Sequence, residues 1–158
     1  MRDLTTYMTT QFTGSAFHFN EELSVIHNVP VFVFTDNGKD DEFYPVLILN
    51  GGAAASIIPG DSGSEHVLIS APLLEMDRNI LLGVLAHEVG HCKLGHFNKK
   101  YEAYINKQEC DDSNFEFEAD DYAFGCGCGD ALLSYLHTQN WDLRLNDRIE
   151  ALNVLLSQ

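Results

Sequence analysis

Basic residues are scarce in this sequence. It contains 9 lysines and arginines against 24 aspartates and glutamates, which gives a formal net charge of -15 at pH 7. Proteins that bind phosphate backbones or anionic membrane surfaces rely on clustered positive charge. The composition therefore argues against nucleic acid as a partner and against docking on an anionic membrane.

Long apolar runs are also missing. Residues 1–19 contain no uninterrupted apolar core of the kind that defines a secretory signal. The most apolar helical stretch, Ile80 to Ala86, is far shorter than the ~20 residues that span a bilayer. We therefore expect no membrane insertion and a cytoplasmic location. The sequence carries no signal of oligomeric state.

Cysteine is limited to four residues, which lack the paired spacing of a metal knuckle. In a chain without an export signal, a disulfide framework is not expected. Cys126 and Cys128, within GCGCG, could bind a soft metal or become oxidised. Free thiols are the simpler interpretation of both.

Apolar residues make up 45% of the 158 residues, so residues 1–158 can form one domain with a core of its own. Strand-like segments precede helical ones, which is typical of an α+β fold. We predict a helical segment over 1–28, a sheet over 30–70 and a helical part over 77–158. The expected strands are Val31–Thr35, Phe43–Leu49, Ala53–Ile58 and His66–Ser70. The expected helices are Pro72–Met76, Arg78–Leu94 with Asp77 as N-cap, Phe97–Glu109, Asn114–Gly125, Ala131–His137 and Asn146–Leu156.

The segment HEVGH, residues 87–91, places two histidines and a carboxylate in one helical turn. His87 and His91 are four residues apart, so their rings project from the same helix face and can bind one cation. Glu88 points roughly 100° away on the helical wheel, where its carboxylate can reach a water on the metal without being a ligand. This arrangement is typical of a site that turns a zinc-bound water into a nucleophile.

A catalytic zinc site usually takes three protein ligands and keeps one position for water, so a third ligand is required. Glu116, on a separate predicted helix 25 positions after His91, is the strongest candidate. Asp120, one turn further, could accept a hydrogen bond from the outer ring nitrogen of a ligand histidine. Glu118 on another face of that helix is one alternative ligand, and His96 is a second.

HEVGHCKLGH followed by FEFEAD resembles the HExxH and ExxAD signature of the metallopeptidase family that includes the heat-shock protease HtpX and the CAAX prenyl protease. The preceding VLISAPLLEMDRNILLGVLA looks like that family's strand, short turn and active-site helix. DRIEAL near the end is similar to its closing helix. The resemblance covers residues 43–152, and its specificity lies in the two motifs occurring together and in this order.

The resemblance implies a zincin-like fold of the gluzincin type, with a small mixed sheet of about four strands packed on the active-site helix. It also implies one Zn²⁺ per chain. The implied roles are zinc ligands for His87, His91 and Glu116, general base and acid for Glu88, support of a ligand histidine for Asp120, and a structural or transition-state role for Arg148.

This sequence also departs from the family. Its members commonly carry a Thr-His-Pro segment shortly before the closing helix, where this chain has Trp141, Asp142 and Leu143. The best-known members are membrane-embedded, whereas this sequence looks like a catalytic domain alone.

Two functions therefore follow as hypotheses. The first is a zinc-dependent endopeptidase acting on a polypeptide. Its substrate would run antiparallel to the strand of small residues Ala53, Ala54, Ala55, Ser56 and Ile57, although an ordinary edge strand is an equal interpretation of that segment. The second is a catalytically silent zinc-binding module of the same fold, with a regulatory or interaction role.

Overall fold

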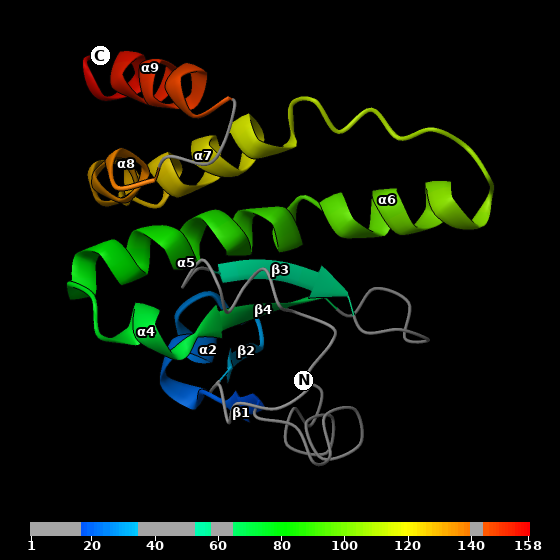
Figure 1. The fold of residues 1–158 in the computed structure, drawn as a ribbon, viewed down its shortest axis with the longest axis horizontal. Helices are drawn as coiled ribbons and strands as arrows, with labels where there is room; N and C mark the ends of the chain where they lie inside the picture. The colour runs from blue at the N-terminus through cyan, green and yellow to red at the C-terminus, as the bar shows by residue number, and fades with distance from the viewer. Residues whose placement is uncertain (1–16, 35–52, 58–64, 140–143) are drawn as a thin grey trace.

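A four-stranded sheet forms one layer of the molecule in the computed structural model, which describes residues 17–34, 53–57, 65–139 and 144–158. Its strands lie in the order β1-β2-β4-β3. Strand β2 is parallel to β4, and the outer strands β1 and β3 pair antiparallel with their neighbours. Strand β3 therefore lies at one edge of the sheet in the described part of the chain (Figure 1). The strands are β1 (Phe17–Phe19), β2 (Val31–Phe34), β3 (Ala53–Ile57) and β4 (Glu65–Ser70).

The start of the described chain differs from the prediction of a helical segment over 1–28. Residues 17–19 form strand β1, because the Phe-His-Phe alternation pairs with β2. The helix begins only after Asn20, whose side chain accepts a hydrogen bond from the Leu23 amide at 2.9 Å. It forms α2 (Glu21–His27) and ends at Asn28 in the left-handed conformation, with φ of 56°.

The other predicted strands agree with the structure where it describes them. Residue 35 of the first and residue 58 of the third lie outside the described residues, as does all of the strand expected over 43–49. The fourth begins one residue earlier than expected, at Glu65.

Apart from α2, which lies between β1 and β2, the described helices follow the strands in sequence, which is typical of an α+β fold. Asp77 caps the long helix α5 as predicted, since its carboxylate accepts from the amides of Asn79 at 2.9 Å and Ile80 at 3.4 Å. The segment expected as a helix over 97–109 instead begins at His96 and ends at Ile105. The helices are α4 (Ala71–Leu74), α5 (Arg78–Lys93), α6 (His96–Ile105), α7 (Phe115–Gly125), α8 (Gly129–His137) and α9 (Leu145–Leu156).

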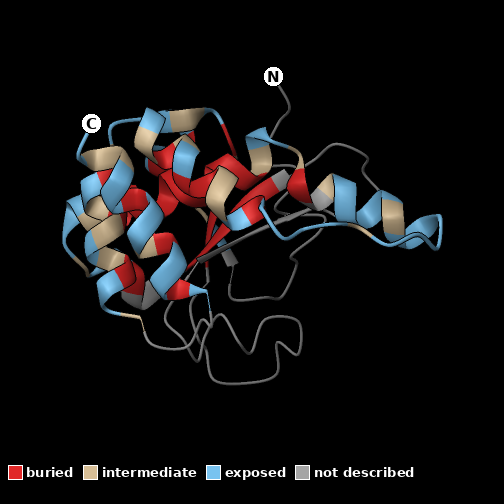
Figure 2. Ribbon diagram, turned by 90° about the horizontal axis from the view of Figure 1, so that it is seen from above, coloured by how far each residue is buried: buried red, intermediate tan, exposed pale blue. Residues whose placement is uncertain are grey.

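Helix α5 lies between two hydrophobic clusters and is buried over most of its length (Figure 2). On one side Leu81, Val84, Leu85 and Val89 pack with sheet residues such as Val67. On the other side α7 and α8 cover it, and α9 packs on those two helices. The second cluster includes Ala123, Leu132, Leu136, Leu145 and Leu152 of these helices. A helix enclosed on two sides has little freedom to shift, so α5 is a rigid support for its side chains.

Helix α6 continues past the end of α5 and extends away from these clusters (Figure 1). Its far end is exposed, with Tyr104 80% and Ile105 56% accessible. The chain then returns to begin α7 beside the carboxyl-terminal half of α5 (Figure 1). Among the helices in the described ranges, none is both long and apolar enough to cross a membrane.

Candidate metal centre

The two histidines of HEVGH face each other across one turn of α5. Their Nε2 atoms are 3.2 Å apart, and their rings are nearly perpendicular, at 88°. Both residues are buried. Together with Glu88 they offer three ligand atoms within 4.8 Å of one another. The spacing of four residues therefore brings both rings to one point, as the sequence predicts.

Glu116 reaches the same point from α7. Its Oε2 lies 2.9 Å from the Nε2 of His87 and 3.1 Å from the Nε2 of His91. The side chain is half exposed, so one side of the cluster faces solvent. Burial opposes ionisation of Glu116, but its hydrogen bonds to the two histidines outweigh this and hold its pKa well below the ordinary value.

The distances among these three side chains fit a zinc ion. Zinc bonds of about 2.0–2.1 Å in a tetrahedron separate the ligand atoms by roughly 3.3 Å. The three separations at the cluster are 2.9, 3.1 and 3.2 Å. Outward shifts of a few tenths of an ångström would therefore open a tetrahedral face around the ion. Two imidazoles and one carboxylate are also a donor set that zinc commonly takes.

Glu88 lies beside this cluster with its side chain largely buried. One of its carboxylate oxygens is 3.9 Å from the Nε2 of His87. Burial favours the neutral form of His87, but hydrogen bonds to Asp120 and Glu116 and the negative charge of Glu88 outweigh it, raising the pKa of His87 to about 10. The cluster therefore has a strong preference for positive charge.

The outer nitrogen of His87 contacts Asp120. The His87 Nδ1 and the Asp120 Oδ1 are 2.8 Å apart, and both groups are buried. Arg148 from α9 donates to both carboxylate oxygens of Asp120, each at 2.8 Å. Burial raises the pKa of Asp120, but the bonds from Arg148 and His87 outweigh it and lower that pKa. An ionised Asp120 accepts from Nδ1–H, so Nε2 is the nitrogen of His87 that would give up its proton to bind a cation.

The outer nitrogen of His91 contacts His96 instead of a carboxylate. Their Nδ1 atoms are 2.9 Å apart, and the Nε2 of His96 is 3.0 Å from the Oε2 of Glu118. His96 is fully buried and Glu118 is partly exposed. The two alternative ligands considered from the sequence, His96 and Glu118, thus lie on the far side of His91 from Glu116. The sequence signal for this pair is the histidine just after Gly95, which the sequence suggests only as an alternative metal ligand.

Close contact between α5 and α7 allows these side chains to meet. A Cβ added at Gly90 would lie 3.0 Å from the Cβ of Tyr122 and 3.2 Å from the Cα of Ala119. Such a separation leaves no room for a methyl group without movement of α7. The glycine of HEVGH therefore lets the backbone that carries Glu116 and Asp120 approach the histidine helix.

The remaining predicted residues are those of strand β3, the two cysteines after α7 and the segment before α9. Strand β3, with Ala53 to Ile57, runs beside α5 at the sheet edge (Figure 1). Cys126 and Cys128 are thiols at the opposite end of α7 from Glu116. Trp141, Asp142 and Leu143 fall outside the described residues.

Comparison with known proteins gives a match to a protein family. The model of peptidase family M48 matches residues 58–110, which include α5 and α6 but end before Glu116. No curated protein and no solved structure matches the chain. The matched segment contains the first of the two motifs, with both histidines and Glu88, whereas the second motif lies outside it. The match covers residues 58–110 of the 158, so this part of the chain is similar to peptidase family M48.

Proposed function

We propose that this protein is a zinc-dependent endopeptidase of zincin-like, gluzincin fold. The observation that carries the proposal is the convergence of His87, His91 and Glu116 within 2.9–3.2 Å of one another, with the Glu88 carboxylate beside them. We further propose that residues 1–158 act as one domain, because α5 packs against both the sheet and the carboxyl-terminal helices.

His87, His91 and Glu116 would hold one zinc ion per chain. When bound, the ion supplies a Lewis acid that polarises the scissile carbonyl and lowers the pKa of an attacking water to near ~7. The negative charges of Glu116 and Glu88 beside the buried imidazoles favour such a cation. The same charges favour a bound proton, as the raised pKa of His87 indicates. The partly exposed side of Glu116 is where a substrate would enter.

Glu88 would act as general base and then as general acid. It takes a proton from the attacking water while the oxygen bonds to the carbonyl carbon, and passes that proton to the amide nitrogen as the C–N bond breaks. Its position beside His87, at 3.9 Å, puts its carboxylate next to the ion site without crowding the nitrogen that faces it.

A polypeptide substrate would add to the open edge of β3. Strand β3 pairs antiparallel with β4 through residues 53–57, and its other edge has no strand among the described residues. A substrate in extended form can use the free main-chain groups of such an edge. We propose an antiparallel orientation along Ala53, Ala54, Ala55, Ser56 and Ile57.

Arg148 has a structural role in this proposal. Its guanidinium binds both oxygens of Asp120 and is buried. A planar guanidinium engaged in this way orients the carboxylate that in turn orients His87. We therefore assign Arg148 to positioning and not to the transition state.

Substitution of Glu88 tests the catalytic proposal. We expect Glu88→Gln to keep one zinc per chain by mass spectrometry and to lose hydrolysis of a diverse peptide library. The matched control is Glu102→Gln on exposed α6, which should keep both zinc and activity. Full hydrolysis by Glu88→Gln would overturn the mechanism.

The second candidate, a catalytically silent zinc-binding module, is favoured by one observation. Trp141, Asp142 and Leu143 stand where family members commonly carry Thr-His-Pro. Peptide cleavage by the wild-type protein that stops on addition of a chelator would reject this candidate. Zinc-dependent stabilisation without any cleavage would support it against the endopeptidase.

A further inference from the structure

We infer that His96 and Glu118 are positioning residues for His91. They hold it in the tautomer that carries its proton on Nδ1, so that Nε2 can bind zinc. The inference rests on the proposed zinc site and adds to it a support for the second histidine. It assigns no ligand role to either residue.

The hydrogen-bonding capacity of the three groups determines the direction of each bond. An ionised carboxylate can only accept, so the Nε2–H of His96 donates a hydrogen bond to Glu118 Oε2 at 3.0 Å. A neutral His96 ring then carries a lone pair on Nδ1. This lone pair faces the Nδ1 of His91 at 2.9 Å and accepts a hydrogen bond from the Nδ1–H of His91. With its Nδ1 protonated, His91 has Nε2 as the nitrogen that would bind zinc.

Each histidine of HEVGH therefore has a carboxylate behind its outer nitrogen, reached directly by His87 and through a second imidazole by His91. His87 donates directly to Asp120 at 2.8 Å. His91 reaches its carboxylate through the imidazole of His96. In both cases a carboxylate outside the cluster selects the protonated outer nitrogen, which is the common arrangement around histidines that bind metal.

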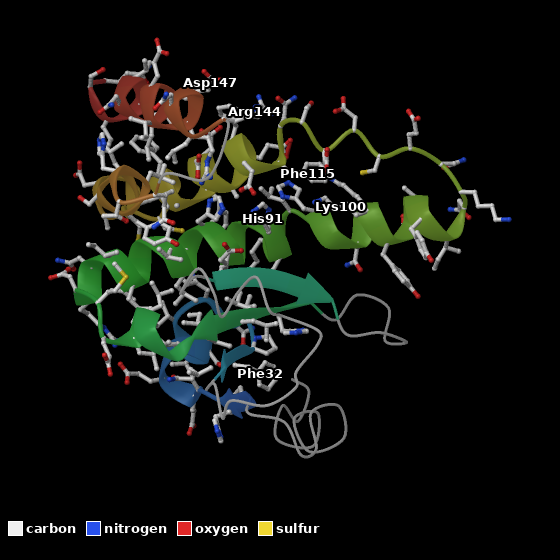
Figure 3. All side chains as sticks on the ribbon, viewed as in Figure 1. Phe32, His91, Lys100, Phe115, Arg144 and Asp147 are labelled. Carbon is white, nitrogen blue, oxygen red and sulfur yellow. The ribbon has the colours of Figure 1, made fainter. Side chains whose placement is uncertain are left out.

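Packing determines the plane of the His96 ring. The ring stacks on Phe115 with centroids 4.0 Å apart and planes 4° from parallel. The ammonium groups of Lys99 and Lys100 each lie 5.8 Å from the Phe115 centroid. Figure 3 shows Phe115 close to His91 where α7 begins beside α5. Because the stacking needs no ring nitrogen, packing and hydrogen bonding at position 96 can be separated by substitution.

The turn between α5 and α6 places His96 against His91. Gly95 has φ of 69°, a left-handed conformation that allows the chain to turn sharply after α5. His96 is the first residue of α6 and is fully buried, although most of α6 is exposed. A buried histidine at the start of an otherwise exposed helix is consistent with a supporting role at the site.

His96→Phe tests the inference, because phenylalanine keeps an aromatic ring for stacking on Phe115 and removes both nitrogens. We expect zinc affinity, measured by competition with a chromogenic chelator, to fall about 10- to 100-fold. Glu118→Gln retains an acceptor oxygen, so it should reduce zinc affinity less than Glu118→Ala does. Combined with His96→Phe, Glu118→Ala should cause no further loss, because the bond it removes is already absent.

Nuclear magnetic resonance supplies a readout that packing alone would not change. In zinc-loaded wild-type protein, we expect a slowly exchanging Nδ1–H signal from His91, correlated with its ring nitrogens. The signal should disappear or exchange rapidly in His96→Phe and should persist in Glu118→Gln.

The outcomes separate this inference from the proposed function. A wild-type protein that binds no zinc would overturn both. If the wild-type protein binds zinc and both His96→Phe and Glu118→Ala bind it as tightly as the wild type does, the role of His96 and Glu118 is overturned. The zinc site itself would then stay in place. Should His96→Phe fail to fold, the comparison of Glu118→Gln with Glu118→Ala decides, because Glu118 is partly exposed and its truncation leaves the core intact.

Discussion

Gly90 and Ala119 bring the two halves of the candidate metal centre together. A Cβ at position 90 would stand 3.2 Å from both the Cα and the carbonyl oxygen of Ala119. These are backbone atoms, which cannot rotate aside as a flexible side chain could. The distance between α5 and α7 is therefore set at this contact, one residue before His91.

Gly90→Ala should push α7 away from α5. Overpacking of this kind costs about 1–3 kcal/mol of unfolding free energy. The shift also moves Glu116 and Asp120 from the histidines, so we expect weaker zinc binding in chelator competition. The control is Gly125→Ala, since an added Cβ there meets nothing within 4 Å. Unchanged zinc affinity in Gly90→Ala would contradict the role of this contact.

Glu116→Ala and Glu118→Ala should have different kinds of effect on the bound metal. Removal of a ligand changes the coordination of the ion, whereas removal of an outer partner changes only its affinity. In cobalt-substituted protein we expect Glu116→Ala to alter the visible absorption spectrum and Glu118→Ala to preserve it. Zinc affinity should fall more than 100-fold in the first variant, beyond the ~10- to 100-fold typical of outer partners. The reverse order would exchange the two roles.

Asp120→Asn should destabilise the protein strongly. It leaves the guanidinium of Arg148 buried without an ionised partner, and loss of one member of a buried pair costs about 3–5 kcal/mol. Urea unfolding at saturating zinc measures the change. Glu22→Gln is the control, because Glu22 and Arg78 form an exposed pair at 2.5 Å whose loss should cost less than about 1 kcal/mol. Equal effects of the two substitutions would argue against a buried pair at Asp120.

Zinc-free protein should lose stability as the pH rises from 6.5. The pKa of His87 is about 10 in the folded protein against 6.5 ordinarily, so above 6.5 the folded state keeps a proton that the unfolded state has released. The free energy of unfolding then decreases with pH. Thermal unfolding between pH 6.5 and about pH 8.5, a range in which ordinary phenols stay protonated, is the measurement.

His87→Gln should flatten this pH dependence, because the group responsible is gone. In the wild-type protein, zinc affinity should increase as the pH rises over the same range, because zinc has to displace the proton from His87. A zinc-free wild-type protein whose stability rises from pH 6.5 to about pH 8.5 would contradict the electrostatic description of the cluster.

Local sequence patterns predicted the features that depend only on residues close together in the chain. Asp77 starts α5 because its carboxylate caps the first amides, and the i, i+4 spacing of the histidines brings their rings together. Residues 17–19 were missed as a strand because their partner, residues 32–34, is distant in sequence. A three-residue strand has almost no signal of its own.

The sequence by itself determined that two histidines and Glu88 would share one turn of a helix. It also ranked Glu116 above Glu118 as the partner. Only the tertiary structure decided what meets those histidines from other elements: Glu116 at the inner nitrogens, Asp120 with Arg148 behind His87, and His96 with Glu118 behind His91. Helical periodicity is a property of the local backbone. The approach of α7 to α5 depends on packing at Gly90 and on the turn at Gly95, which no local pattern specifies.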